Sequence, residues 1–203
     1  MTPHAYFLKA TQVDPDNATA AFHLGLVLLH DKNDPENALV SLDKCLALDP
    51  EHREAHYQLG RLHYQAGKPA KAREHLEQEL DRNPEHGGSH FFLGRLALDS
   101  ANLEMANEHL RKAVTFAPQH EAAFSALGSL YLLVGAEEAA SQVHREAIRL
   151  SPDDVENRMK QAAILMNRGL AVEATELLLT AYALDPSQTE VLFSLGSAYL
   201  AAG

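Results

Sequence analysis

The chain has 203 residues, 46% of them hydrophobic, which is enough to bury a substantial core. Its formal net charge of −11 argues against nucleic acid and against an anionic membrane surface as the main partner, because both attract clustered positive charge. Cys45 is the only cysteine, which excludes an intramolecular disulfide, and no apolar stretch approaches the roughly 20 residues of a membrane span. We therefore expect no membrane insertion and a location in the cytoplasm.

Prolines recur along the chain at a nearly constant spacing. One interval of 35 residues is followed by four of 34 in the series Pro15, Pro50, Pro84, Pro118, Pro152 and Pro186. Ten residues after each proline stands a small residue, preceded by leucine in five of the six cases: Gly25, Gly60, Gly94, Gly128, Ala162 and Gly196. Such a period indicates a repeat protein in which each unit is one helix pair.

Each unit is predicted to contain two antiparallel helices. The first begins about three residues after the proline, and the second runs to the next proline, which cannot continue a helix. The turns between them fall near Gly67, Ala101, Gly135 and Gly169, where glycine accepts the backbone angle that ends a helix. The glycine ten residues after the proline lies inside the first helix, so we expect a neighbouring helix to pass too close there for a side chain.

In chain order, the pattern predicts one array over residues 1–203. Residues 1–17 supply a second helix only and residues 189–203 a first helix only, with five full repeats between them: 18–52, 53–86, 87–120, 121–154 and 155–188. The first full repeat carries one extra residue between Asp31 and Pro35, and the fifth has Gln161 in place of leucine. The incomplete end repeats leave two alternatives open. Either the chain is a piece of a longer array or of a larger protein, or copies join head to tail as a homo-oligomer whose end helices complete a repeat.

The recurring Leu-Gly pair, a large residue such as Tyr131 or Tyr199, alanine, a large apolar residue and proline together resemble the tetratricopeptide repeat family. Glu79 and His144 depart from it, since they replace a small and a large apolar residue. The resemblance implies an all-α, right-handed superhelical solenoid whose first helices line a concave groove. It also implies a non-catalytic scaffold that binds a peptide or protein segment in that groove. Two alternatives stay open: a targeting module of a larger glycosyltransferase, sulfotransferase or hydroxylase, and a self-assembling scaffold.

One stripe of the first helices is predicted to carry the binding chemistry. It comprises positions 4, 7, 8, 11, 14 and 15 after each proline, which share a face at helical spacing. Aromatic rings beside arginine are typical of binding hot spots, and they concentrate in the second and third repeats. The candidate groove residues are Phe22, His23, Tyr57, Gln58, Arg61, Tyr64, Phe91, Phe92, Arg95, Asp99, Ser125 and Ser129. The alternative is that the aromatics pack between first helices and that the arginines pair with acids such as Asp99.

Other chemistry finds little support in the sequence. Histidine pairs occur at helical spacing, such as His52 with His56 and His56 with His63, but no cysteine cluster or His-Glu-x-x-His helix accompanies them. No nucleophile motif or dinucleotide fingerprint is present, and Gly67-Lys68 fits an ordinary turn better than a phosphate loop. We expect no catalytic residues, no metal and no cofactor, and a buried, unreactive Cys45.

Overall fold

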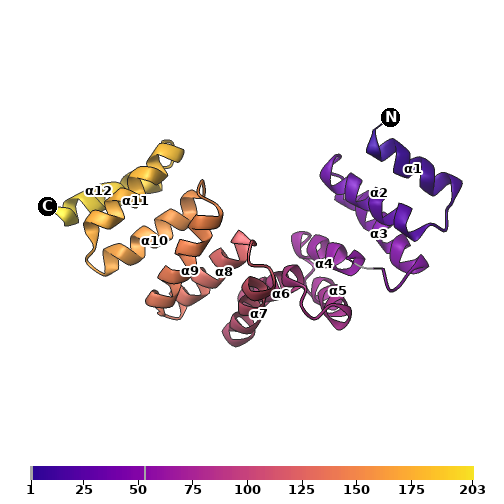
Figure 1. The fold of residues 1–203 in the computed structure, drawn as a ribbon, viewed down its shortest axis with the longest axis horizontal. Helices are drawn as coiled ribbons and strands as arrows, with labels where there is room; N and C mark the ends of the chain where they lie inside the picture. Colours follow the sequence, from indigo (N-terminus) through magenta and orange to yellow (C-terminus); the bar gives the residue numbers. More distant parts are fainter. Residues whose placement is uncertain (1, 53) are drawn as a thin grey trace. The chain divides into compact units, whose positions relative to one another are not determined.

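The computed structural model describes residues 2–52 and 54–203. Residues 1 and 53, at which two of the predicted repeats begin, lie outside the described residues. Within the described part the chain forms twelve α-helices and no strand (Figure 1). They are α1 (Pro3–Val13), α2 (Ala18–His30), α3 (Pro35–Leu48), α4 (Ala55–Gln65), α5 (Pro69–Arg82), α6 (Gly87–Asp99), α7 (Leu103–Phe116), α8 (Glu121–Leu133), α9 (Glu137–Leu150), α10 (Val155–Asn167), α11 (Ala171–Leu184) and α12 (Thr189–Ala202).

The helices follow the predicted alternation, and the all-α prediction is confirmed. Helix α2 packs against α3, α4 against α5, α8 against α9 and α10 against α11, so sequential neighbours form the pairs. Helix α1 packs against α2 and α12 against α11, as expected for a second helix and a first helix that stand outside a full repeat. Among the residues that the structure covers, no helix is both long and apolar enough to cross a membrane.

The chain divides into two compact units, with the boundary inside α6 between Leu96 and Ala97. The core of the N-terminal unit contains buried leucines of α2, α3, α4 and α5, with Leu42, Leu59 and Leu76 fully buried. The core of the C-terminal unit includes Ile164 and Leu178. In both units the buried side chains come from consecutive helices, as in repeat proteins, whose units contact mainly their neighbours.

The turns within repeats use left-handed backbone where the sequence predicts it. The φ angles are +65° at Gly67, +75° at Gly135, +74° at Gly169 and +56° at Ala101. Glycine adopts this conformation at little cost, which explains its place at these helix ends. In the longer turn of the first full repeat, Asn33 takes this role with φ +50°.

The glycine inside the first helix marks a close approach of two helices, as predicted. A Cβ atom on Gly60 of α4 would lie 2.6 Å from Cγ of Leu76 on α5, and one on Gly25 would lie 2.9 Å from Cγ of Leu42. A Cβ on Gly196 of α12 would meet nothing within 4 Å. The same sequence position is therefore tightly covered in one repeat and open in another.

Cys45 lies on α3 with no exposed surface. Burial, reinforced by the charge of Asp49, raises the pKa of its thiol to about 11. A thiol with a raised pKa forms little thiolate near neutral pH, so Cys45 is a packing residue with low reactivity.

Candidate functional site

Half-buried aromatic rings of α4 and α6 form a cluster in the N-terminal unit. The ring centroids of Tyr64 and Phe92 lie 5.4 Å apart, and those of Tyr57 and Phe92 lie 6.1 Å apart. The guanidinium carbon of Arg95 stands 6.0 Å from the centroid of the Tyr64 ring, at the outer limit of a cation–π contact. We call Tyr64, Phe92 and Arg95 the aromatic–arginine cluster. All three side chains keep part of their surface accessible.

Two of the predicted groove residues are buried. Phe22 and Phe91 each keep 6% of their surface, and Phe22 packs against His52 with ring centroids 4.5 Å apart. His23, half-buried, stacks on Phe7 at 5.1 Å. Neither phenylalanine therefore presents an accessible ring.

Tyr57 also has a packing role, although it is less buried. Its ring lies 4.5 Å from that of His86 by centroid, and a Cβ on Gly88 would come within 2.8 Å of it. Burial raises the pKa of the Tyr57 hydroxyl. Tyr57 therefore packs against His86 and also contacts the Phe92 ring of the aromatic–arginine cluster.

The two candidate arginines have different surroundings. Arg95 lies beside Tyr64, whereas Arg61 lines a cavity with Leu29, Leu62 and Lys68. The Nε atom of Arg61 is buried and has no hydrogen-bond partner among the described residues, and the same holds for Oε1 of Gln58. Arg95 thus contacts an aromatic ring, whereas Arg61 lines a cavity.

In the C-terminal unit, the predicted serines belong to a polar network. The hydroxyl of Ser129 donates to the backbone carbonyl of Ser125 at 2.9 Å and accepts from Nζ of Lys160 at 3.0 Å. Lys160 also pairs with Glu156 at 2.5 Å. Asp99, in the last turn of α6, is exposed. Lys160 was not among the predicted residues, although it stands eight residues after Pro152, on the same stripe.

A second accessible site in the C-terminal unit was also missed. A cavity of about 260 Å³ lies between α10 and α12 and is lined in part by Met159, Ala163, Met166 and Phe193. Phe193 is 79% exposed. All four side chains occupy stripe positions 7, 11 or 14 after a proline, so extending the same rule to the fifth and sixth repeats would have found them.

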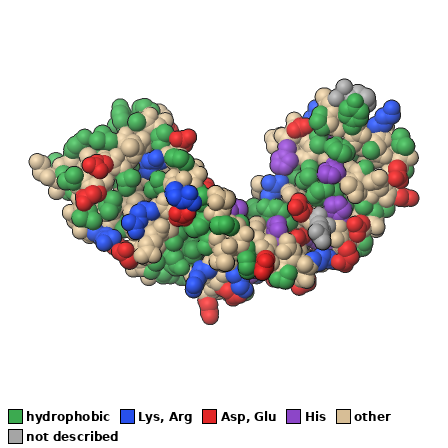
Figure 2. Space-filling model, viewed as in Figure 1, with side chains coloured by type: hydrophobic (Ala, Val, Ile, Leu, Met, Phe, Trp, Pro, Cys, Tyr) green, Lys and Arg blue, Asp and Glu red, His purple; other side chains and the backbone are tan. Residues whose placement is uncertain are grey.

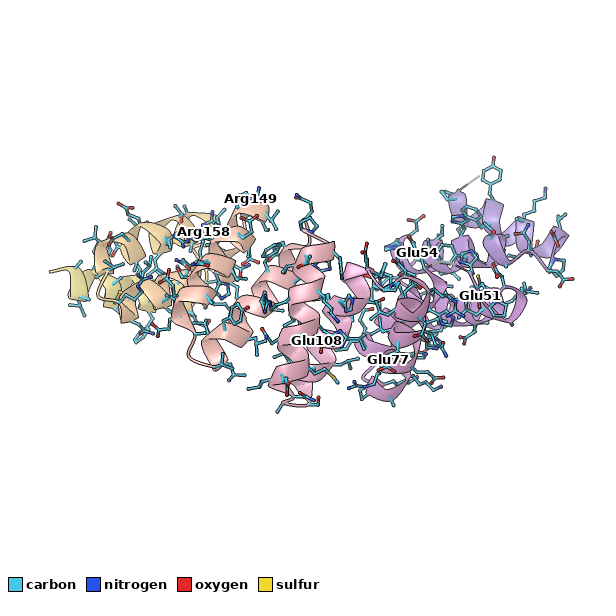
Figure 3. All side chains as sticks on the ribbon, turned by 60° about the horizontal axis from the view of Figure 1, so that its bottom comes forward. Glu51, Glu54, Glu77, Glu108, Arg149 and Arg158 are labelled. Carbon is cyan, nitrogen blue, oxygen red and sulfur yellow. The ribbon has the colours of Figure 1, made fainter. Side chains whose placement is uncertain are left out.

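Acidic side chains gather at the loop between α3 and α4, where Figure 3 labels Glu51 and Glu54. Both oxygens of the Glu51 carboxylate accept from the Arg82 guanidinium at 3.0 Å, and Arg82 also donates to the carbonyl of Pro50 at 3.1 Å. Arg82 therefore ties this loop to the end of α5. Glu79 is buried beneath it, and burial raises the pKa of its carboxyl.

Histidines gather on the N-terminal unit, as the face in Figure 2 shows. His56 and His63 of α4 face His75 of α5, with Nδ1 of His56 3.1 Å from Nδ1 of His75 and the rings of His63 and His75 stacked at 5.5 Å. Burial lowers the pKa of each ring, and that of His75 is lowered further by its two neighbours. No group of three metal-binding side chains that could hold an ion occurs in the part of the chain that the structure describes. We call these rings the histidine triplet.

The histidine triplet predicts acid sensitivity. Because the folded pKa values lie below the unfolded value of about 6.5, the unfolded chain binds more protons, and stability falls as pH drops from about 7.5 to about 5.5. Glu79 acts in the opposite direction, since its raised pKa favours the folded state in acid. Urea unfolding across this range should give a flatter profile for His75→Phe, which keeps a ring, than for wild type. The exposed His30→Gln is the control, and an unchanged slope in His75→Phe contradicts the assignment.

The twelve described helices and their 34-residue period define a helical-repeat protein. Tetratricopeptide repeat models match residues 4–52, 29–86 and 88–120, which together cover more than half of the chain. The chain belongs to the tetratricopeptide repeat family.

Several solved structures share this fold. Cut9-Hcn1, an APC/C hetero-tetramer, matches with a TM-score of 0.80 at 19% identity, over 96% of this chain and 38% of the other. YrrB, a TPR protein with an unusual peptide-binding site, matches with a TM-score of 0.70 at 21% sequence identity. The match covers 93% of this chain and 96% of YrrB. MamA from Desulfovibrio magneticus RS-1 matches with a TM-score of 0.69 at 21% sequence identity. The match covers 85% of this chain and 97% of the MamA chain. The chain thus spans 38% of the Cut9-Hcn1 chain but nearly all of YrrB. A sequence search of curated proteins finds no match.

Proposed function

We propose that this protein is a non-catalytic interaction scaffold that holds a peptide or protein segment on the stripe of its first helices. The observation that carries the proposal is the aromatic–arginine cluster of Tyr64, Phe92 and Arg95. Rings that keep part of their surface accessible give a partner rigid apolar area at low entropic cost, and the guanidinium gives directional contacts to carboxylates. YrrB, which shares the fold, is a TPR protein with a peptide-binding site, and this supports the proposal.

The C-terminal unit offers a second contact area of different character. Met159 and Met166 line the cavity beside the exposed ring of Phe193. Methionine side chains are flexible and polarisable and adapt to partners of varied shape. We propose that this cavity binds an apolar side chain of a protein partner, as a contact area of the C-terminal unit by itself. A targeting module of a larger enzyme would bind its partner through the same surface. A catalytic domain in the same polypeptide, beyond these 203 residues, would distinguish that role from a free-standing scaffold.

Charge reversal at Arg95 tests the proposal. Arg95→Glu removes the cation beside Tyr64 without touching a buried leucine, so the fold should survive while affinity for the bound protein falls by about tenfold or more. Proteins captured from lysate by wild type are identified, purified and titrated against both forms. Lys71→Glu, an exposed position on α5, gives the same charge change away from the stripe. Equal affinity of Arg95→Glu and wild type for every purified partner rejects the assignment.

Self-assembly is a second candidate, favoured by the open face of α12. Leu192 and Tyr199, which flank Gly196, are 45% and 53% exposed, whereas the equivalent His56 and His63 of α4 are each 7% exposed beneath α5. Phe7 of α1 stands in the register of the fully buried second-helix leucines yet is only half-buried. We propose that α1 of one copy covers this face of α12 in another, in a head-to-tail contact.

Sedimentation equilibrium tests the head-to-tail contact. Wild type should show masses that are multiples of 22.3 kDa and that grow with concentration. Leu192→Glu should be monomeric, because it places a charge in the contact, while its helix content stays unchanged. A wild-type protein that remains strictly monomeric at high concentration rules the contact out.

A further inference from the structure

A cavity of about 480 Å³ lies in the N-terminal unit, between the ends of α2 and α4 and the first turns of α3. Its apolar wall includes Leu29, Leu39 and Leu62, and its cationic side chains include Arg61 and Lys68. We call it the turn cavity. Its lining combines this apolar wall with two cations and one carboxylate, that of Glu36, in a chain whose net charge is −11.

Arg61 is the side chain that points to a missing partner. Its Nε atom is buried and makes no hydrogen bond within the described residues. Neither Arg61 nor Lys68 belongs to an ion pair among those residues, although Arg82, Arg149 and Arg168 all do. Buried polar groups in folded proteins almost always have a partner. Arg61 and Lys68 line the same cavity without an ion pair to any described residue, which is a reason to expect an anionic ligand there.

The turn that borders the cavity is the one that breaks the repeat period. The first full repeat is one residue longer than the others, and its turn contains Asn33 with φ +50°. The amide of Asp34 donates to the carbonyl of Leu28 at 2.9 Å, and its carboxylate caps α3 through the amide of Asn37 at 3.2 Å. The extended turn is therefore held at both ends, and it places Asn33 and Pro35 at the rim of the cavity.

We propose that the turn cavity binds one internal acidic side chain, Glu or Asp, that stands next to an aliphatic residue in the segment held by the protein. This inference rests on the proposed function and adds the chemistry of one subsite. The guanidinium of Arg61 would take the carboxylate in a two-pronged contact, with Lys68 as a second cation. The leucine wall would cover the aliphatic neighbour.

Charge limits the ligand to a single carboxylate. Glu36 lies at the rim of the cavity and is exposed, and the acidic chain as a whole repels strongly acidic segments. At physiological salt this repulsion is screened beyond about 8 Å, so the nearby cations dominate for one isolated carboxylate. A run of acidic residues would meet Glu36 and lose this advantage.

Nuclear magnetic resonance titration with defined peptides tests the subsite. The probe is the capped peptide acetyl-Ser-Leu-Glu-Leu-Ser-amide, compared with the same peptide carrying Gln in place of Glu and with an acetyl-Ser-Leu peptide that has a free C-terminal carboxylate. With the Glu peptide, we expect the side-chain Nε–H signal of Arg61 and the amide signals of Leu62 and Gln65 to shift. Arg61→Gln should weaken binding by about tenfold. Arg61→Lys should restore part of the affinity, because lysine keeps the positive charge but cannot donate two parallel hydrogen bonds to a carboxylate.

Lys44→Ala, an exposed cation on α3 away from the cavity, is the matched control and should bind as wild type. Equal binding of the Glu and Gln peptides overturns the proposal, as does unchanged binding by Arg61→Gln. Tighter binding of the peptide with the free C-terminus also overturns it, in favour of a chain-end site. Partner capture that depends on Arg95 but not on Arg61 would leave the scaffold function intact while the subsite fails, so the two failures are distinguishable.

Discussion

Gly60→Ala is expected to lower the free energy of unfolding by roughly 1–3 kcal/mol, whereas the same substitution at Gly196 should raise it by up to about 1 kcal/mol. At Gly60 the new methyl group would lie 2.6 Å from Cγ of Leu76, so α4 and α5 must move apart. At Gly196 it would meet nothing within 4 Å, and only the better helix propensity of alanine remains.

Urea unfolding followed by circular dichroism measures both changes. Each variant is the control for the other, since Gly60→Ala and Gly196→Ala make the same substitution at the same position of a first helix. Two values of the same sign would show that propensity, and not the approach of the second helix, sets the effect. In a self-assembling protein Gly196→Ala would also weaken association, so stability is measured at a concentration where the chain is monomeric.

Asn157→Ala is expected to destabilise the C-terminal unit by about 1–3 kcal/mol, because it leaves buried polar groups unpaired. His144 has no exposed surface, and its Nδ1 lies 3.1 Å from Oδ1 of Asn157. An amide oxygen only accepts, so Nδ1 carries the proton and donates. The amide nitrogen of Asn157 in turn donates to Glu121 at 2.8 Å. Nε2 of His144 has no partner among the described residues, and burial lowers the pKa of the ring.

The double variant His144→Leu/Asn157→Ala should recover part of this loss. Leucine at 144 gives Gly128 the contact that Leu76 gives Gly60, and it removes the buried donor that the single variant leaves unpaired. A double-mutant cycle from urea unfolding measures the coupling between the two residues. If the double variant is less stable than Asn157→Ala by the full cost of His144→Leu, the two side chains are independent and the network carries no coupling energy.

The architecture was predictable from sequence because the helix ends depend on the backbone properties of proline and glycine. Proline cannot continue a helix and glycine accepts positive φ. The recurring prolines, such as Pro50, and the turn glycines, such as Gly67, therefore set the helix ends largely independently of packing. The closeness of two helices at Gly60 follows from the cost of glycine inside a helix.

The candidate site was predictable only in part. Helical spacing puts Phe22, Phe91 and Phe92 on one stripe, but it does not say how deeply a neighbouring helix covers each ring, and the structure buries the first two and leaves the third accessible. That difference depends on side-chain direction and helix crossing, which spacing does not specify. The turn cavity was not predictable, because the extra residue near Asn33 indicates a longer turn without indicating what space it encloses.

The polar layer between α9 and α10 has a consequence for how the protein opens. There Gln161 donates to Ser141 at 3.0 Å while its own oxygen has no partner among the described residues, close in sequence to the His144–Asn157 contact. In an array whose repeats touch only their neighbours, such a layer is where a local opening costs least, and the helices on one side can exchange amide hydrogens while the other side stays protected. We therefore expect amide exchange to begin in the helices after α9, while the N-terminal unit, which contains Tyr64, Phe92 and Arg95, stays protected.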